Sequence, residues 1–199
     1  MKEIISYLEN VLRELESNKD RLNALDAAIG DGDHGTNVVR GFQAVLSQKH
    51  LFTNESSIDK DLMVCATQLM SKIGGSSGPL LGSAFMALSM ALKGKTTFTN
   101  QDIAQALQMS IERIQALGKS RGGEKTMLDA LIPAAQALQH ASALLDLNIA
   151  YDAATKGAND TISMLATKGR ASYLGERSIG HMDPGACSIS LIFKGLAGK

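Results

Sequence analysis

Tryptophan is absent from this 199-residue sequence, and its only aromatic residues are three tyrosines and five phenylalanines. So few rings offer little surface on which nucleic-acid bases could stack. The 20 basic and 20 acidic residues give a formal net charge of zero, without the basic excess that attracts a phosphate backbone. Both deficits argue against a nucleic-acid-binding protein, and we expect no nucleic-acid partner.

Cysteine is also scarce, since only Cys65 and Cys187 occur and they form no CxxC pair. This usage is typical of buried thiols in a reducing compartment rather than of a disulfide framework. No stretch is long and apolar enough to span a bilayer. Charged residues interrupt the N-terminal segment, which therefore resembles an amphipathic helix more than a signal peptide. We expect a cytoplasmic protein that does not enter a membrane.

Apolar residues recur at helical spacing along most of the chain, and few stretches alternate as a half-buried strand would. Thr99 or Asn100 is a suitable N-cap for one helix, Gly94 is a suitable C-cap for the helix before it, and Pro184 fits a first turn. Eight helices are predicted, at about residues 4–15, 34–48, 58–71, 77–93, 100–117, 125–145, 151–167 and 184–196. No linker divides the chain, so residues 1–199 are expected to form one all-α domain of antiparallel helices.

The most informative segment is residues 26–37, DAAIGDGDHGTN, where Asp26, Asp31 and Asp33 alternate with glycines. Three acids this close repel one another unless a cation neutralises them, and their hard oxygen ligands suit Mg²⁺ or Ca²⁺. An EF-hand that starts at Asp31 would place Phe42 where a bidentate Glu is required, so that motif is excluded. A solvated turn with helix-capping acids is the alternative. Because Mg²⁺ usually completes its shell with phosphate oxygens, we expect a phosphorylated ligand beside the site.

A second glycine-rich segment, residues 74–82, precedes an apolar helix. Glycines at a helix N-terminus form a phosphate cradle, and Ser76 and Ser77 add hydroxyl donors. A flexible connector with a serine N-cap is the alternative interpretation. A Walker A loop is absent, because both GK[ST] tripeptides lack the upstream glycine, which is replaced by Ser89 and Arg113. Any nucleotide is therefore bound by neither a P-loop nor a Rossmann unit.

The longest irregular stretch is residues 169–186, and a loop of this length in a compact domain is usually functional or disordered. Arg170 and Arg177 suit phosphate by geometry and permanent charge. Asp183 precedes Pro184, so helix capping explains it equally well. A lid over a phosphoryl group or a partner contact would use the apolar residues Tyr173, Leu174 and Ile179.

Four segments in this order resemble the nucleotide-binding L subunits of bacterial dihydroxyacetone kinases. They are DAAIGDGDHGTN (26–37), GGSSGPL (74–80), GEKTMLD (123–129) and GRASYLGERSIGHMDPGA (169–186). The resemblance runs from residue 26 to about residue 188. It implies an eight-helix antiparallel barrel that binds ADP or ATP with two Mg²⁺ ions at one end.

The resemblance also implies roles for individual residues. Asp26, Asp31 and Asp33 correspond to the magnesium ligands, and Arg170 in the lid would be the catalytic residue, stabilising charge during transfer. Contacts to the nucleotide are implied for His34, Gly35, Thr36, Asn37, Ser76, Ser77, Gly118, Met127, Arg170, Asp183, Pro184 and Gly185. No nucleophile is expected on this chain.

Members of this family work in two ways. In one, the domain is fused to a substrate-binding domain and uses ATP. In the other, it is a separate subunit whose bound ADP is rephosphorylated by a phosphohistidine on the M subunit of the sugar phosphotransferase system. The γ-phosphate then passes to dihydroxyacetone on the K subunit. At 199 residues the chain has no room for a substrate domain, so the separate subunit is favoured.

Three alternatives remain open from the sequence. They are the nucleotide domain of another two-part kinase, such as one acting on fatty acids, a nucleotide-dependent regulatory partner of a transcription factor, and a Mg²⁺-dependent phosphatase. The oligomeric state is open as well, a homodimer included.

Overall fold

The computed structural model describes residues 3–142 and 144–199, and within them the chain is helical. The α-helices are α1 (Glu3–Ser17), α2 (Lys19–Ile29), α3 (His34–Ser47), α4 (Ile58–Lys72), α5 (Ser77–Ala91), α6 (Asn100–Gly118), α7 (Leu128–His140), α8 (Leu147–Asp160) and α9 (Pro184–Ala197). Short 3₁₀ segments are η1 (Lys49–Leu51), η2 (Thr161–Ser163) and η3 (Arg170–Ser178). One isolated antiparallel bridge joins Thr99 to Leu144. The predicted all-α class is confirmed.

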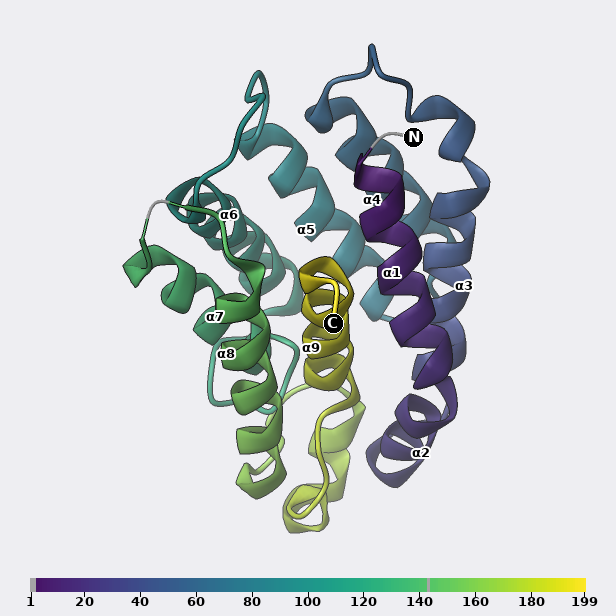
Figure 1. The fold of residues 1–199 in the computed structure, drawn as a ribbon. Coiled ribbons are helices and arrows are strands. Elements are labelled where there is room, and N and C mark those ends of the chain that lie inside the picture. Colours follow the sequence, from purple (N-terminus) through teal and green to yellow (C-terminus); the bar gives the residue numbers. More distant parts are fainter. Residues whose placement is uncertain (1–2, 143) are drawn as a thin grey trace.

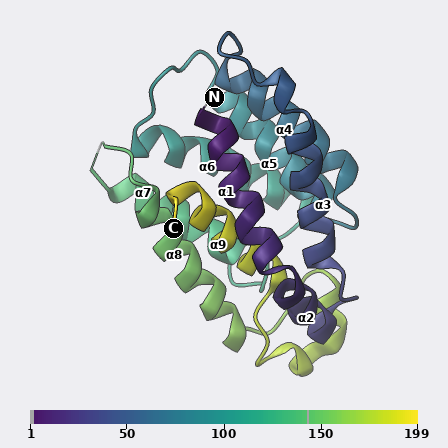
Figure 2. The same ribbon diagram turned by 45° about the vertical axis from the view of Figure 1, so that its right-hand side comes forward.

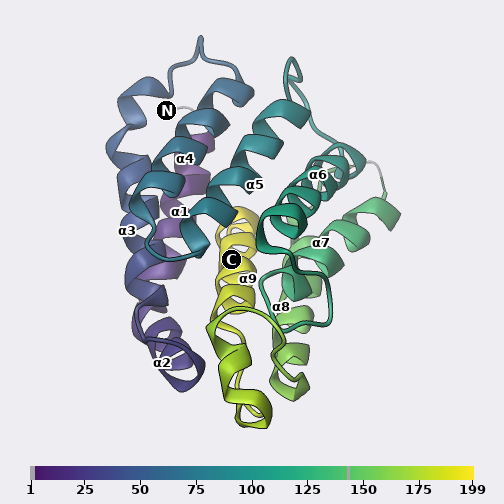
Figure 3. The same cartoon turned by 180° about the vertical axis from the view of Figure 1, so that it is seen from behind.

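The contacts between eight of these helices close a ring, and Figure 1 shows these helices from the side. Each of α1, α3, α4, α5, α6, α7 and α8 packs on the next helix in this order, and α9 packs on both α8 and α1. Neighbours in sequence are thus neighbours in space, and they run antiparallel, as the view from behind also shows (Figure 3). The predicted eight-helix antiparallel barrel is confirmed.

The helix α2 was missing from the prediction. It lies outside the ring at one end of the barrel, beside η3 (Figure 2). Its sequence has no continuous apolar face, and only Leu22 and Ile29 of this helix are buried. Packing against α3, α9 and η3, rather than a continuous apolar face, therefore stabilises this helix.

Two predicted helices have wrong bounds. The helix expected over residues 125–145 is α7, which begins at Leu128 and ends at His140. The helix expected over 151–167 is α8, which begins earlier, at Leu147, and ends earlier, at Asp160. Asp146 caps α8 by accepting a hydrogen bond from the Asn148 backbone at 3.0 Å. The fully buried Asn100 side chain donates to the carbonyls of residues 142 and 144, so a turn replaces the helix there. Residue 143 of the predicted helix lies outside the described residues.

Local sequence signals fix where α6 and α9 begin. Thr99 and Asp102 form a capping box, as expected from Thr99 at this position. Pro184 occupies the first turn of α9, and the Asp183 carboxylate accepts a hydrogen bond from the Ala186 backbone at 2.7 Å. Almost all of α9 is buried, because it packs against α1, α7 and α8 and lies central in Figure 1.

The interior of the barrel is apolar but is not filled completely. Fully buried side chains include Leu15, Phe42, Leu69, Ile114 and Leu138. A cavity of about 810 Å³ is lined by Phe42 and Ile114 among others, and Glu3 and Ile4 at the N-terminal end of α1 also line it. None of the described helices combines the length and hydropathy needed to cross a membrane.

The helices α7 and α8 approach closely at Gly157. A Cβ atom at this position would lie 2.1 Å from the Asp129 backbone oxygen, far inside van der Waals contact. Glycine therefore sets the spacing between these two helices, and with it the start of α7 near the pocket described below.

Candidate functional site

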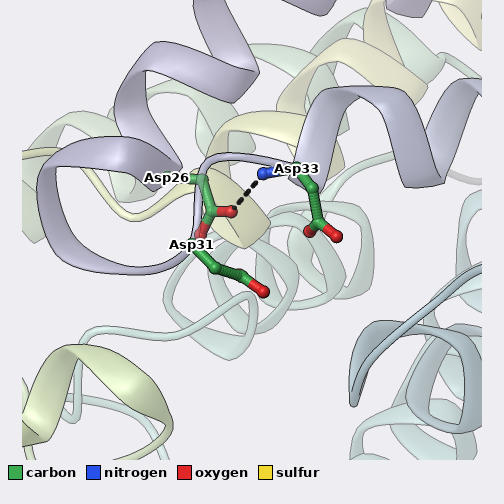
Figure 4. Close-up of side chains that lie close together, drawn as sticks. All are labelled: Asp26, Asp31 and Asp33. Carbon is green, nitrogen blue, oxygen red and sulfur yellow. Dashed lines mark hydrogen bonds between the residues drawn. The ribbon is translucent and has the colours of Figure 1, made fainter.

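Three carboxylates meet at the end of the barrel that carries α2. Asp26 lies in the last turn of α2, Asp31 lies in the following loop, and Asp33 directly precedes α3. One oxygen from each carboxylate lies within 4.8 Å of the other two, which is close enough to share bound cations (Figure 4). This is the cluster that the sequence spacing predicts, and its residues are called the triad below.

The triad is held by its own backbone. The Asp26 carboxylate accepts hydrogen bonds from the backbone N–H groups of Asp33 at 2.9 Å and His34 at 3.2 Å. A Cβ on Gly30 would lie 2.3 Å from Asp26 Oδ1, so glycine is required where the loop folds back on this side chain. Asp31 and Asp33 are exposed, while Asp26 is half-buried. The loop thus presents two exposed carboxylates and fixes the third.

A pocket of about 340 Å³ opens beside the triad. Its lining comes from α3, the start of α5, the end of α6, residues 168–171 and the start of α9. Every residue to which the resemblance assigns a metal or nucleotide contact lines it, except Gly35 and Thr36. Sequence reasoning did not single out several further lining residues, namely Leu80, Ile114, Ser120, Lys125 and Lys168.

Gly35 and Thr36 have other contacts. A Cβ on Gly35 would lie 2.1 Å from the Lys19 backbone oxygen, so this glycine lets α3 begin against α2. The Thr36 backbone N–H donates to Asn23 Oδ1 at 3.0 Å, and its hydroxyl accepts from Asn23 Nδ2. In this structure both residues join α2 to α3.

The pocket combines polar and apolar walls. Gly74 and Gly75 precede Ser76 and Ser77 at the start of α5, and this segment offers hydroxyl and backbone donors without bulky side chains. The apolar part of the lining includes Leu80, Ile114 and Met127. Such a pocket suits a ligand with a charged end and a flat apolar end.

The stretch of residues 164–182, which contains η3, is called the lid segment. Arg170 Nη1 lies 2.6 Å from Asp31 Oδ2, so the lid segment contacts the triad directly. Ala166, Ala171 and Leu174 pack against Ile29 of α2. Tyr173, by contrast, is 89% exposed. Arg177 is exposed and does not line the pocket, so of the two arginines proposed for phosphate only Arg170 is in place.

Burial changes two titratable groups at the pocket. Desolvation raises the pKa of Asp183 to about 7, although the hydrogen bond from Ala186 opposes this. Desolvation also lowers the pKa of His34, against the attraction of Asp26 and Asp33. The His34 ring lies 3.1 Å from the Ser188 hydroxyl. His34 is therefore held as a buried polar residue beneath the triad.

The residues present fit a divalent cation beside an anion. Hard carboxylate oxygens match Mg²⁺. The ion pair between Arg170 and Asp31 shows that a positively charged group can lie beside the triad. Fold and site together define a helical barrel with a carboxylate-edged pocket, whose glycine- and serine-rich wall suits a phosphorylated ligand.

The DAK2 domain family matches residues 28–198, and the chain belongs to this family. Several relatives carry the words ADP-binding subunit in their names. The chain is 42% identical to one from a dihydroxyacetone kinase of Listeria innocua that depends on phosphoenolpyruvate, over 95% of this chain and 91% of that protein. It is also 42% identical to one from a phosphotransferase-system-dependent dihydroxyacetone kinase of Lactococcus lactis, over 96% and 94%.

A solved structure shows the same fold. The dihydroxyacetone kinase of C. freundii in complex with AMP-PNP and Mg²⁺ aligns with a TM-score of 0.78 and 28% identity. The alignment covers all of this chain and 34% of that one, so the chain spans about a third of that kinase.

Proposed function

We propose that this chain is the ADP-binding subunit of a phosphoenolpyruvate-dependent dihydroxyacetone kinase. The observation that carries the proposal is the triad at the edge of a pocket that contains a glycine- and serine-rich helix start. Two relatives named as such subunits match it over nearly their whole length at 42% identity. The fused C. freundii kinase matches at only 28%, which favours a separate subunit over a fused domain.

The triad is proposed to hold two Mg²⁺ ions. Its oxygens lie within 4.8 Å of one another, and paired catalytic ions typically lie about 3.5–4 Å apart. Mg²⁺ held by these carboxylates would neutralise negative charge on the phosphate oxygens. In this arrangement Asp31 and Asp33 are exposed ligands, while Asp26 also keeps the loop folded.

The other pocket residues are proposed to place the nucleotide. Ser76 and Ser77 would donate to phosphate oxygens, and the start of α9 at Asp183, Pro184 and Gly185 would close the opposite side. Met127 and Gly118, with their apolar neighbours, would receive the base. His34 and Asn37 line the pocket next to the triad.

Arg170 is proposed as the catalytic residue. Its guanidinium already lies at the triad, where it can meet charge that develops on a transferred phosphoryl group. Phosphoryl transfer needs positioning and charge neutralisation more than covalent chemistry, so no nucleophile is required on this chain.

Two partners follow from this function. A phosphohistidine on an M subunit would give its phosphoryl group to ADP, with the P–N bond breaking as a P–O bond to the β-phosphate forms. Dihydroxyacetone on a K subunit would then receive the γ-phosphoryl group. Both partners must reach the end of the barrel that carries the triad and the lid segment.

A single-turnover experiment tests this proposal. The chain is loaded with ATP and Mg²⁺, freed of excess nucleotide, and mixed with a K subunit that carries dihydroxyacetone. We expect about one dihydroxyacetone phosphate per loaded chain, with ADP still bound. Release of inorganic phosphate without that product would instead identify a phosphatase and would overturn the assignment.

A further inference from the structure

Lys125 is a buried cation that the function above does not use. Its side chain is almost fully enclosed, with the residue only 1% exposed. The ammonium Nζ donates hydrogen bonds to three backbone carbonyls, those of Thr161 at 2.6 Å, Met164 at 3.3 Å and His181. An ammonium group has three N–H donors, so all of them are engaged. None remains for a phosphate oxygen.

The three carbonyls lie at the two ends of the lid segment. Thr161 directly follows α8 and precedes the lid segment, Met164 begins it, and His181 lies where it approaches α9. These two parts of the chain are also joined directly, because the Gly180 N–H donates to the Ile162 carbonyl at 2.8 Å. Lys125 therefore sits at the base of the lid segment and bonds to both sides of it.

Lys125 also ties this base to the pocket wall. It belongs to the α6–α7 loop, which lies beside the lid segment in Figure 3. The Thr167 N–H donates to the Glu124 carbonyl at 3.4 Å, and the next residues, Thr126 and Met127, line the pocket. Lys125 thus bonds to both ends of the lid segment and belongs to the loop that forms part of the pocket lining.

The backbone of Lys125 has a conformation that lysine rarely adopts, which indicates that its side chain is needed there. Lys125 has a φ of 61°, in the left-handed region where glycine is favoured and most side chains are strained. Gly123, two residues earlier, adopts a similar φ of 84° without that strain. A lysine in such a position is explained by the three carbonyls that it binds. Burial lowers the pKa of Lys125, and the negative charge of Asp183 opposes that shift.

We propose that Lys125 is a positioning residue, which holds the two ends of the lid segment together and thereby sets where Arg170 lies relative to the triad. Although Lys125 lines the pocket, it acts through the lid segment, because backbone carbonyls take all three of its N–H donors. The inference rests on the function proposed above, since it assigns Lys125 a part in phosphoryl transfer.

The main test compares two lysines in the same backbone region. Lys125→Met removes the ammonium but keeps an unbranched side chain. Lys119→Met is the matched control, because Lys119 also has a positive φ, of 48°, but is exposed and does not line the pocket. Trypsin cleavage after Arg170 and Arg177 reports whether the lid segment is held, with and without ADP and Mg²⁺.

We expect Lys125→Met to be cleaved in the lid segment at least about tenfold faster than wild type, and Lys119→Met to be cleaved at the wild-type rate. In single turnover with the K subunit, the transfer rate per bound nucleotide should fall at least about tenfold in Lys125→Met. The ADP dissociation constant should rise by less, about threefold. Lys125→Gln keeps two N–H donors without charge and should restore part of both losses.

A purely structural role makes a different prediction. In that case Lys125→Met lowers the melting temperature, but folded and loaded molecules transfer phosphate at the wild-type rate and resist trypsin as before, and the proposal is overturned. If Lys125→Met does not fold, Lys125→Gln carries the same comparison. The trypsin comparison needs no kinase activity, so failure of wild-type transfer would count against the proposed function alone.

Discussion

The guanidinium of Arg170 lies 2.6 Å from the carboxylate of Asp31, measured between Nη1 and Oδ2. This ion pair joins the lid segment to the triad, and both of its residues line the pocket. Both side chains are largely exposed, at 65% and 43%, so the pair adds little to stability. Its importance is positional, because it places a permanent cation where a cation-binding site meets a phosphate pocket.

Arg170→Ala should therefore slow phosphoryl transfer far more than it weakens ADP binding. Removing one preorganised charge donor typically costs about 10²–10³ in rate. Single-turnover transfer and equilibrium ADP binding are measured on the same preparation, with Arg177→Ala as the control in the same lid segment. An equal loss of rate and affinity would make Arg170 a ground-state contact instead.

The two kinds of carboxylate in the triad should respond differently to substitution. Asp26→Ala removes the acceptor of two backbone N–H groups and should cost the metal-free protein roughly 1–2 kcal/mol. Asp33→Ala removes an exposed carboxylate without a capping hydrogen bond, so metal-free stability should stay within about 0.5 kcal/mol.

Both variants should lose the stabilisation that ADP with Mg²⁺ gives to wild type, which is about 2.7 kcal/mol at a ligand concentration of 100 times Kd. Urea unfolding with and without ligand measures these differences. Full ligand stabilisation of Asp33→Ala would remove Asp33 from the proposed metal ligands.

Asp183 should make metal-free stability depend on pH. Burial raises the pKa of its carboxyl group to about 7, above the value of 3.8 for an unperturbed Asp. Between these values the native state holds a proton that the unfolded chain has released, so stability should fall as pH rises from about 4 to about 7 and then level off. Asp183→Asn keeps a good N-cap and should flatten this decline. Urea unfolding at pH 5 and pH 8 compares the two proteins, and an unchanged slope in the variant would refute this origin.

Gly157→Ala should destabilise the protein even though it lies inside a helix. Alanine normally favours a helix over glycine by about 1 kcal/mol. Here the new Cβ would lie 2.1 Å from the Asp129 oxygen, so α8 must move away from α7 at a cost of about 1–3 kcal/mol. Asn159→Ala, at an exposed position of α8, is the control and should be neutral or slightly stabilising. Stabilisation by Gly157→Ala would show that the two helices can separate freely.

Much of the fold could be predicted because most helices carry a continuous apolar face and clear end signals. The capping box at Thr99 and Asp102 and the proline start of α9 are local, so the sequence alone reveals them. The helix α2 lacks such a face and depends on partners distant in sequence, which no local pattern indicates. The turn after α7 depends on the buried side chain of Asn100, about forty residues earlier.

The site divides in the same way. The triad is predictable because Asp31 and Asp33 are near neighbours in a glycine-rich turn, and Asp26 precedes them by a short helical stretch. Lys125 could not be singled out, since its partners are carbonyls of residues 36 to 56 positions further along the chain. The packing role of Gly35 against Lys19 likewise emerges only when α2 is in place.

The most direct test of the central claim is the nucleotide content of the freshly purified, extensively washed protein. Acid extraction followed by chromatography identifies and counts what the chain retains. The account predicts close to one ADP per chain, which a phosphorylated M subunit then converts to ATP without release. A chain that emerges empty, binds ATP weakly and turns it over freely in solution would contradict the proposal of a subunit that is recharged in place.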